Sequence, residues 1–371
     1  MTVMNLTYLF MLPIGIIAVI ITARIAGLVH EIAPFAYPNA RIMAKTGRLL
    51  KNEQYGELSE SRSLDDIATL LKETEYVDYI SAYVGERCTI IDIERAFNNH
   101  LADVYNQVYA ISPPSVKPVF EVLLKRWDIE NIIRTLRCLY AGKDPKDYLI
   151  ATGTFSASAR EQLAKSQTVE EVAMSVTAEF EHILNNVQDQ ELVVIESTLL
   201  QYYYESLWQY LDNAMDRNAL LLKDYFGMQI DTINIVAALR LNIMEERDDA
   251  ESKFLDVTYH VSAEDLKSIV TAEDISIAHN ILSRTPYAPV LEAHMAALEQ
   301  DKDVAVVERA LNAMIILKGR EVAMLNPLGI GPSIGYLAQK QDEVRRLKTI
   351  AIGAFGGISP DKIKQYVGVS S

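Results

Sequence analysis

Residues 128–137, DIENIIRTLR, decide the fold, because the same pattern returns at 231–240 as DTINIVAALR and more weakly at 343–352 as EVRRLKTIAI. The first two copies share Asp, Asn, Leu and Arg at identical offsets, whereas the third keeps the acid and the apolar stripe. Self-similarity at a regular spacing indicates a repeated structural unit. The residues at the shared offsets are Asp128, Asn131 and Arg137 in the first copy, Asp231, Asn234 and Arg240 in the second, and Glu343 and Arg346 in the third.

A second element upstream of each copy repeats with the same steps. Glu94, Glu196 and Glu308 each follow a β-branched apolar residue in a helical pattern. The distance along the sequence from Glu94 to Glu196 differs by one residue from that between Asp128 and Asp231. The distance from Glu196 to Glu308 equals that from Asp231 to Glu343. Two elements that move together along the chain predict three duplicated units.

The motif itself predicts a structural role. Apolar residues at helical spacing form one face that we expect in the core, namely Ile129, Ile132, Ile133, Leu136 and Tyr140 in the first copy and Val344, Leu347, Ala351 and Phe355 in the third. We expect the acid to open its helix, beside the positive end of the helix dipole. The Asn three residues later lies on the same side and can satisfy backbone groups at the turn.

Composition favours an all-α protein. The 371 residues include 16 Gly and 12 Pro, and apolar spacing predicts helices over 90–109, 119–140, 160–184, 191–222, 232–244, 304–324 and 333–354. We find no strand alternation. The net charge of −15 argues against a nucleic-acid partner, which would need a basic face.

The N-terminus departs from this pattern. Residues 6–23, LTYLFMLPIGIIAVIITA, carry no charge and are long enough for most of a bilayer core, so they predict a membrane anchor. The first basic residues follow this segment, which places the rest of the chain on the cytoplasmic side of the cell membrane. Prolines within 30–39 predict a linker. The predicted division is an anchor at 1–29 and helical repeat domains at 30–150, 151–253 and 254–371.

Several stretches resemble one family in the right order. These are residues 36–41 (AYPNAR), 127–132 (WDIENI) and 335–347 (GYLAQKQDEVRRL). Together with the threefold repeat, they resemble the C subunit of archaeal-type (A-type, V-type) ATP synthases, whose eukaryotic counterpart is the d subunit of the vacuolar ATPase. The resemblance covers roughly residues 37–367, and Arg346 departs from the Asn usual at its position.

The resemblance implies a specific architecture and role. Three similar helical domains would surround a pseudo-threefold axis as a funnel or socket, whose mouth accepts the D and F subunits of the central stalk. The other end would rest on the membrane ring of proteolipid subunits. Such a protein is a non-catalytic rotor subunit, present once per complex, that transmits torque between ion translocation and ATP synthesis or hydrolysis without binding a nucleotide.

Other features of the sequence bear on function. The glycines between 329 and 335 lack the strand and the GK[ST] ending of a phosphate loop, so we interpret them as a flexible entry into the last helix. The six histidines show no metal-ligand spacing, and we expect neither a metal nor a cofactor. The aromatic run at 202–204 indicates packing between helices, with some rings available to the stalk. We expect acids on the inner wall of the socket to bind a basic stalk foot.

Two other classes remain as alternatives. A membrane-tethered helical scaffold or adaptor unrelated to a rotary ATPase is disfavoured because solenoid repeats are about 20–50 residues long, which is shorter than the step from Asp128 to Asp231. An all-α enzyme is disfavoured because no acid, base and metal ligands cluster in the sequence. The segment at 6–23 lies outside the resemblance, and we hypothesise that it inserts into the lumen of the rotor ring or its lipid plug.

Overall fold

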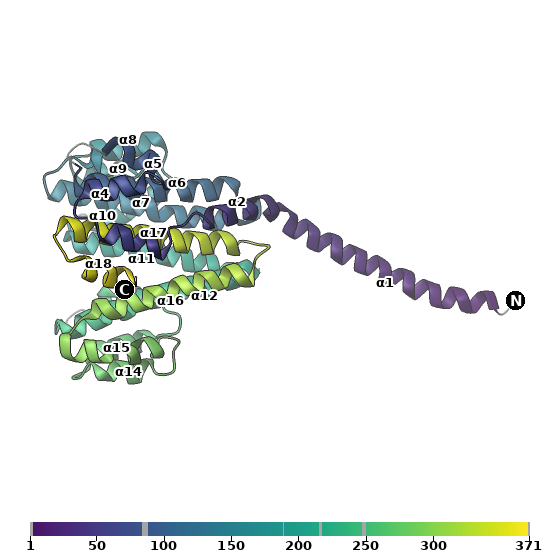
Figure 1. The fold of residues 1–371 in the computed structure, drawn as a ribbon. Coiled ribbons are helices and arrows are strands. Elements are labelled where there is room, and N and C mark those ends of the chain that lie inside the picture. Colours follow the sequence, from purple (N-terminus) through teal and green to yellow (C-terminus); the bar gives the residue numbers. More distant parts are fainter. Residues whose placement is uncertain (1–2, 84–87, 188, 215–216, 247–249, 370–371) are drawn as a thin grey trace.

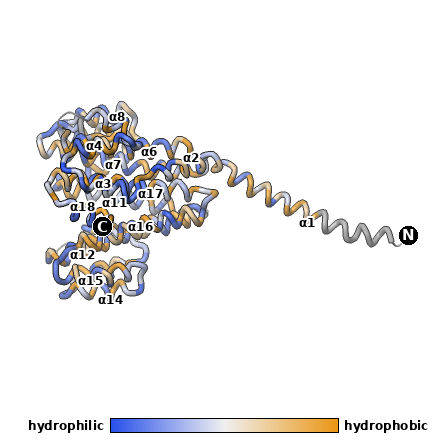
Figure 2. The backbone as a smooth tube through the Cα atoms, viewed as in Figure 1, coloured by the Kyte–Doolittle hydropathy of each residue, from blue (hydrophilic) through white to orange (hydrophobic). Residues whose placement is uncertain are grey.

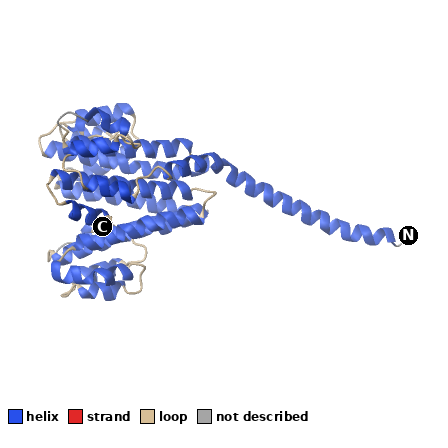
Figure 3. Cartoon of the chain, in the orientation of Figure 1, coloured by secondary structure: helices blue, strands red, loops and turns tan. Residues whose placement is uncertain are grey.

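The computed structural model describes residues 3–83, 88–187, 189–214, 217–246 and 250–369. Every regular element in these ranges is a helix, and they contain no strand (Figure 3). The all-α prediction is therefore confirmed. An apolar helix at the N-terminus also stands apart from the rest of the molecule, as the sequence indicated.

Six long helices of the described chain form the body of the molecule. They are joined in sequence as three hairpins, and Figure 1 shows them lying side by side. Neighbouring hairpins contact each other through α7 and α11, through α12 and α16, and through α17 and α6, so the last hairpin also contacts the first. The long helices are α6 (Ile90–Ile111), α7 (Lys117–Tyr140), α11 (Leu192–Asn213), α12 (Arg217–Ile243), α16 (Val304–Leu325) and α17 (Gly331–Phe355).

Short helices gather toward one end of the long ones, away from α1 (Figure 1). They are α3 (Asn52–Ser59), α4 (Leu64–Leu71), α5 (Val77–Ile80), α8 (Ala157–Lys165), α9 (Val169–Ser175), α10 (Ala178–Val187), α13 (Ala263–Thr271), α14 (Ser276–Leu282), α15 (Ala288–Asp301) and α18 (Pro360–Val367). Short 3-10 turns lie between elements at Ala33–Phe35, Ser81–Tyr83, Pro114–Val116, Pro145–Asp147 and Ala250–Lys253.

Two of the predicted helix spans are wrong. The span 160–184 is broken into α8, α9 and α10, because Thr168 adopts an extended backbone and its hydroxyl caps α9 at the Glu171 amide. The span 191–222 ends at Asn213, and α12 then runs without a break through Gly227. Gly227 stays helical and faces the ring of Tyr259, where an added Cβ would lie 2.5 Å from the nearest ring atom.

The N-terminal segment is more continuous than predicted. α1 (Val3–Ile32), a single 3-10 turn and α2 (Ala36–Thr46) follow one another, so the expected linker at 30–39 is wrong. Pro34 and Pro38 fall in first turns, where a backbone amide has no intrahelical partner to lose. α1 projects away from the bundle (Figure 1), and in Figure 2 its coloured part carries hydrophobic segments interrupted by hydrophilic ones. Residues 16–46 are long and apolar enough to cross a membrane.

The apolar face predicted from the motif is mostly core. Ile129, Ile132 and Leu136 are fully buried, as are Leu347 and Ala351 in the third copy. The prediction is wrong at the last position of each face. Tyr140 is 55% exposed and Phe355 is 66% exposed, because each is the final residue of its helix and extends past the neighbouring elements.

The glycines near 331 allow α16 and α17 to pack closely; they do not form a flexible entry. A Cβ on Gly331 would lie 2.5 Å from the carbonyl oxygen of Val322. A Cβ on Gly335 would lie 2.8 Å from Ala323 Cβ and 2.9 Å from the carbonyl oxygen of Gly319. These distances are shorter than a van der Waals contact, so glycine is required where the two backbones approach each other.

We expect Gly335→Val to destabilise the bundle by about 1–3 kcal/mol, because the added atoms have no space between α16 and α17. Chemical denaturation followed by circular dichroism would measure the change. Gly27→Ala in α1 is the control, because nothing lies within 4 Å of its added Cβ. Equal unfolding midpoints for the two variants would contradict the close-packing interpretation.

Candidate functional site

The motif acid of the first copy lies in the middle of its helix and holds a loop. Asp128 is fully buried, and its carboxylate accepts hydrogen bonds from the Thr154 amide at 2.8 Å, from the Thr154 hydroxyl at 2.6 Å and from the Phe155 amide at 3.1 Å. The expectation that the acid opens the helix is wrong, because α7 begins well before it, at Lys117. In mid-helix the carboxylate is away from the positive end of the helix dipole, and it is stabilised by the loop amides instead.

The second copy repeats this arrangement. Asp231, also fully buried, accepts from the amides of Tyr259 at 2.9 Å and His260 at 2.6 Å, and from the Tyr287 hydroxyl at 2.8 Å. Burial raises the pKa of both Asp128 and Asp231, and the donated hydrogen bonds oppose that rise. The hydrogen bonds donated by the loop are therefore the main interactions that favour the ionised form of each acid.

The motif Asn, three residues after the acid, binds the same loop as the acid does. Asn131 accepts from the Ile150 amide at 2.7 Å and donates to the Ile150 carbonyl at 2.9 Å. Asn234 makes the matching pair with Leu255, at 2.8 Å and 3.1 Å. Both amide side chains are fully buried. Each supplies hydrogen-bond partners to backbone groups of the loop that would otherwise be buried without one.

Gly153 makes the first loop compatible with the acid. Its φ is +124°, a backbone conformation that residues with a Cβ rarely adopt, and a Cβ there would lie 2.0 Å from Asp128 Oδ1. Gly153 is therefore the point where the loop crosses the carboxylate.

We expect Asp128→Ala to lower the free energy of unfolding by about 2–4 kcal/mol, because the amides of Thr154 and Phe155 lose their acceptor in the interior. Asp189→Ala removes the same charge from an exposed position and should change the stability by less than about 0.5 kcal/mol. Denaturant titration of both variants measures this. A loss below about 1 kcal/mol for Asp128→Ala would contradict the assigned role.

In the third copy the acid binds the beginning of the chain. Glu343, which is 2% exposed, accepts from the Leu50 amide at 2.6 Å, from the Tyr76 hydroxyl at 2.9 Å and from Lys340 Nζ at 2.7 Å. Tyr76 matches Tyr287 of the second copy in its bond to the motif acid. The last long helix thus takes its loop partner from the opposite end of the sequence, which joins the two ends of the bundle.

Arg346, the departure from Asn, makes no such loop contact among the described residues. Its Nε lies 2.8 Å from an Asp342 carboxylate oxygen, and its guanidinium carbon is 5.2 Å from the centre of the Tyr55 ring. The third copy therefore holds α3 by stacking an arginine on a tyrosine, in place of the backbone pairing that Asn makes in the other two copies.

His100 is buried beside this junction, where its ring lies 4.2 Å from that of Tyr76 and neither ring nitrogen has a hydrogen-bond partner in the described structure. Burial, followed by the positive charges of Lys340 and Lys45, lowers the pKa of His100 to about 3. The unfolded chain binds a proton near the ordinary histidine pKa of about 6.5, and the folded chain does not. This contribution to stability is therefore complete above about pH 6.5 and is lost as the pH falls toward about 3.

We expect the free energy of unfolding to fall by about 2 kcal/mol between pH 7 and pH 5 through the titration of His100 alone. His100→Phe keeps a ring in the same space without a titrating group, so this part of the acid sensitivity should disappear. Thermal unfolding at both pH values measures the difference between the variant and the wild type. The same pH dependence in both proteins would contradict the assignment.

The remaining motif residues join neighbouring hairpins. Arg137 pairs with Glu196 through bonds of 2.6 and 2.7 Å, and Arg240 pairs with Glu308 at 2.5 Å. Each pair joins a motif helix to the first long helix of the next hairpin. The third copy has Ile352 where Arg would stand, so the contact between α17 and α6 lacks this pair, and Glu94 lies half-buried on α6.

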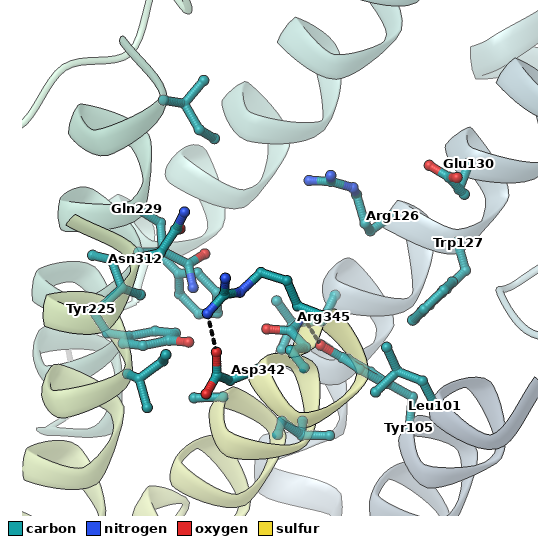
Figure 4. Close-up of a pocket in the computed structure, with 18 of the residues that line it drawn as sticks. Leu101, Tyr105, Arg126, Trp127, Glu130, Tyr225, Gln229, Asn312, Asp342 and Arg345 are labelled. Carbon is teal, nitrogen blue, oxygen red and sulfur yellow. Dashed lines mark hydrogen bonds and ion pairs between the residues drawn. The ribbon is translucent and has the colours of Figure 1, made fainter. Parts of the chain in front are cut away.

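A cavity of about 440 Å³ lies between the six long helices of the described bundle. Figure 4 shows side chains from these helices converging on it. Aromatic and apolar groups make up part of the wall, including Tyr105, Trp127, Tyr203 and Tyr204. The aromatic run at 202–204 therefore contributes both to packing and to the cavity.

The charges on this wall are opposite to the expectation. Its basic side chains are Arg126, Arg134, Arg345 and Lys348, and its acidic ones are only Glu130 and Asp342. The expected acidic inner wall is wrong for this cavity. Nothing in the sequence marks these basic residues as a group, because they are spaced along two helices, α7 and α17, that line one cavity only in the folded protein.

Among the described residues, no three His, Cys, Asp or Glu side chains come together as metal ligands. The motif acids are occupied by loop amides, and the cavity acids are occupied by arginines. The cavity is thus a polar and aromatic surface suited to binding another group by shape and charge.

The fold and the cavity define a wholly helical bundle with a central polar cavity and a projecting apolar helix. The model of the family "ATP synthase (C/AC39) subunit" matches residues 38–366. The chain belongs to this family. It is 31% identical to the C subunit of the A-type ATP synthase of Methanocaldococcus jannaschii over 92% of this chain and 88% of that protein. It is 28% identical to that of Pyrococcus abyssi over 98% of both chains.

Proposed function

We propose that this chain is the non-catalytic C subunit in the rotor of an A-type/V-type ATP synthase. It couples the D and F subunits of the central stalk to the membrane proteolipid ring, and transmits torque between ion translocation and ATP synthesis or hydrolysis. One observation carries the proposal beyond the family. One bundle carries both a cavity bounded by all six long helices and an apolar helix suited to a membrane, which projects from the end where α16 turns into α17.

The polarity of the bundle follows from its loops. Asn39 on α2 donates to the carbonyls of Pro327 and Gly329, at 3.0 Å each, so α1 leaves from the end where α16 turns into α17. The cavity wall extends from Ile334, close to this loop, to Arg134 and Lys348, which lie further along α7 and α17. In this proposal the stalk enters from the end opposite α1, with the membrane on the side of α1.

The contacts between hairpins support the proposed socket. Each hairpin touches the next, and α17 touches α6, as three units around a pseudo-threefold axis require. The proposed domains keep their boundaries at 30–150, 151–253 and 254–371, with residues near 50 and 76 completing the third. A closed ring of packed helices resists twisting, which suits a part that passes torque from one end to the other.

Exposed apolar side chains at the loop end support contact with the membrane ring. Leu220, Met324 and Leu328 are each more than half exposed and lie in or beside the hairpin loops, and Tyr37 and Met43 continue the surface on α2. Such a surface marks an interaction site. In this proposal α1 lies inside the lumen of the proteolipid ring, because a helix in the surrounding bilayer would drag on a rotating part.

The first test is a pull-down from native membranes in mild detergent through a C-terminal tag on the full-length chain. We expect the D and F stalk subunits, proteolipid and ATPase activity to co-purify, with one copy of this chain per complex. The control is the same tag on an unrelated membrane protein. A preparation that contains this chain with unrelated partners would contradict the proposal and favour a scaffold.

The position of α1 can be tested with a photo-crosslinking amino acid in place of Ile20, which is 51% exposed. Inside the ring, irradiation should give adducts with proteolipid subunits alone, whereas a helix outside the ring would also reach stationary membrane subunits. A probe at exposed Leu317, on the bundle, is the control and should give no proteolipid adduct. Adducts of the Ile20 probe with a stationary membrane protein would exclude the lumen.

A further inference from the structure

The pattern of side chains on α1 changes at Arg24. Residues 16–23 are aliphatic or alanine apart from Thr22, and apolar side chains cover every side of this part of the helix. A helix that is apolar all round is suited to hydrocarbon, whereas a helix with one apolar stripe and one polar side lies between a packed surface and water. From Arg24 to its end, α1 has the second pattern.

The stripe of this second part consists of four aliphatic residues that recur at i, i+3, i+4 and i+7, on one side of the helix. These residues, which we call the α1 stripe, are Ile25, Leu28, Val29 and Ile32. The opposite side carries Arg24, Gly27, His30 and Glu31. The first three residues of the stripe are each more than half exposed, and no described side chain of α1 is buried. The chain itself therefore leaves the α1 stripe uncovered.

The level of the bilayer separates the α1 stripe from the lipid. The uncharged residues 6–23 extend about 27 Å as a helix, close to the hydrocarbon thickness of about 30 Å. A deeper position would bring Arg24 into the hydrocarbon, where a charged side chain is unfavourable. The bundle begins at the buried Phe35, about 16 Å beyond Arg24 along the helix. The α1 stripe thus lies between the bilayer and the bundle.

The bundle presents a second apolar surface at the base of α1. Asn39 on α2 is hydrogen-bonded to the loop between α16 and α17. Met324 and Leu328, in or beside this loop, are 72% and 59% exposed, and residues 322–339 carry no charge. An object that touches both this loop and the α1 stripe fills the space between bundle and bilayer, which lipid at the level of residues 6–23 does not.

We infer that the α1 stripe packs on the apolar inner rim of the proteolipid ring, where the ring stands out of the bilayer toward the bundle. The inference rests on the proposed function, in which α1 enters the lumen of this ring. Lipid surrounds a helix evenly and would favour apolar side chains on every side, as before Arg24. Exposed apolar side chains grouped on one side mark a protein contact. α1 therefore lies against one side of the rim, with His30 and Glu31 facing water.

Cysteine labelling with a water-soluble maleimide tests this contact. Leu28→Cys lies in the α1 stripe, His30→Cys lies on the opposite side at nearly the same level, and Ile20→Cys is the reference for burial in lipid. In the intact complex in native membranes, we expect Leu28→Cys to react about tenfold more slowly than His30→Cys, because a packed contact excludes water. Mass spectrometry of the labelled peptides separates each introduced thiol from Cys88 and Cys138.

The full-length chain alone, reconstituted in lipid vesicles, is the matched measurement. There Leu28→Cys and His30→Cys should react equally fast, because no partner covers the α1 stripe, while Ile20→Cys stays unreactive. Protection of Leu28→Cys in these vesicles would show that lipid covers the stripe and would overturn the inference. Equal rates for Leu28→Cys and His30→Cys in the intact complex would overturn it as well.

A pair of charge variants tests the same contact by affinity. Leu28→Glu places a carboxylate in the α1 stripe and should weaken retention of proteolipid in detergent about tenfold, because burial of an unpaired charge is unfavourable. His30→Glu introduces the same side chain on the opposite side and should retain proteolipid as the wild type does. Equal retention by the two variants contradicts the one-sided contact. If the wild type still retains proteolipid and stalk, the proposed function stands; if it brings down no proteolipid, both are wrong.

Discussion

The structure depends on the closure made by Glu343. This buried carboxylate takes hydrogen bonds from Leu50 and Tyr76, near the beginning of the chain, while Lys340 balances its charge from one turn away on α17. The first two motif acids hold loops that follow soon after them in the sequence. The third binds residues near the beginning of the chain, and it adds polar contacts beside the packing of α17 on α6, through which the last hairpin touches the first.

The same motif serves two purposes in each of the first two copies. Its acid and amide fix the loop that covers the hairpin, and its arginine reaches the next hairpin, at Glu196 and Glu308. The interface between α17 and α6 has Ile352 in place of that arginine. There the buried group around Glu343, with Tyr76 and Lys340, supplies polar contacts, so the interfaces differ in chemistry while the helices pack in the same order.

The cavity owes its character to this closure. Because all six long helices contribute to its wall, the charges of α7 and α17 come together at the axis although these helices belong to the first and the last hairpin. The result is a cavity whose wall carries more basic than acidic side chains, in a protein with a net charge of −15.

The helical class, the family and the repeated residues can all be read from the sequence, because hydrophobic spacing and duplicated motifs are local patterns that do not depend on how the chain folds. It also identified the buried face around Ile132 and Leu136. The binding of a loop by Asp128 in mid-helix, the helix near 30–39 and the basic cavity wall became visible only in the folded protein. These depend on groups far apart in sequence, whose desolvation and pairing are fixed only when the helices meet.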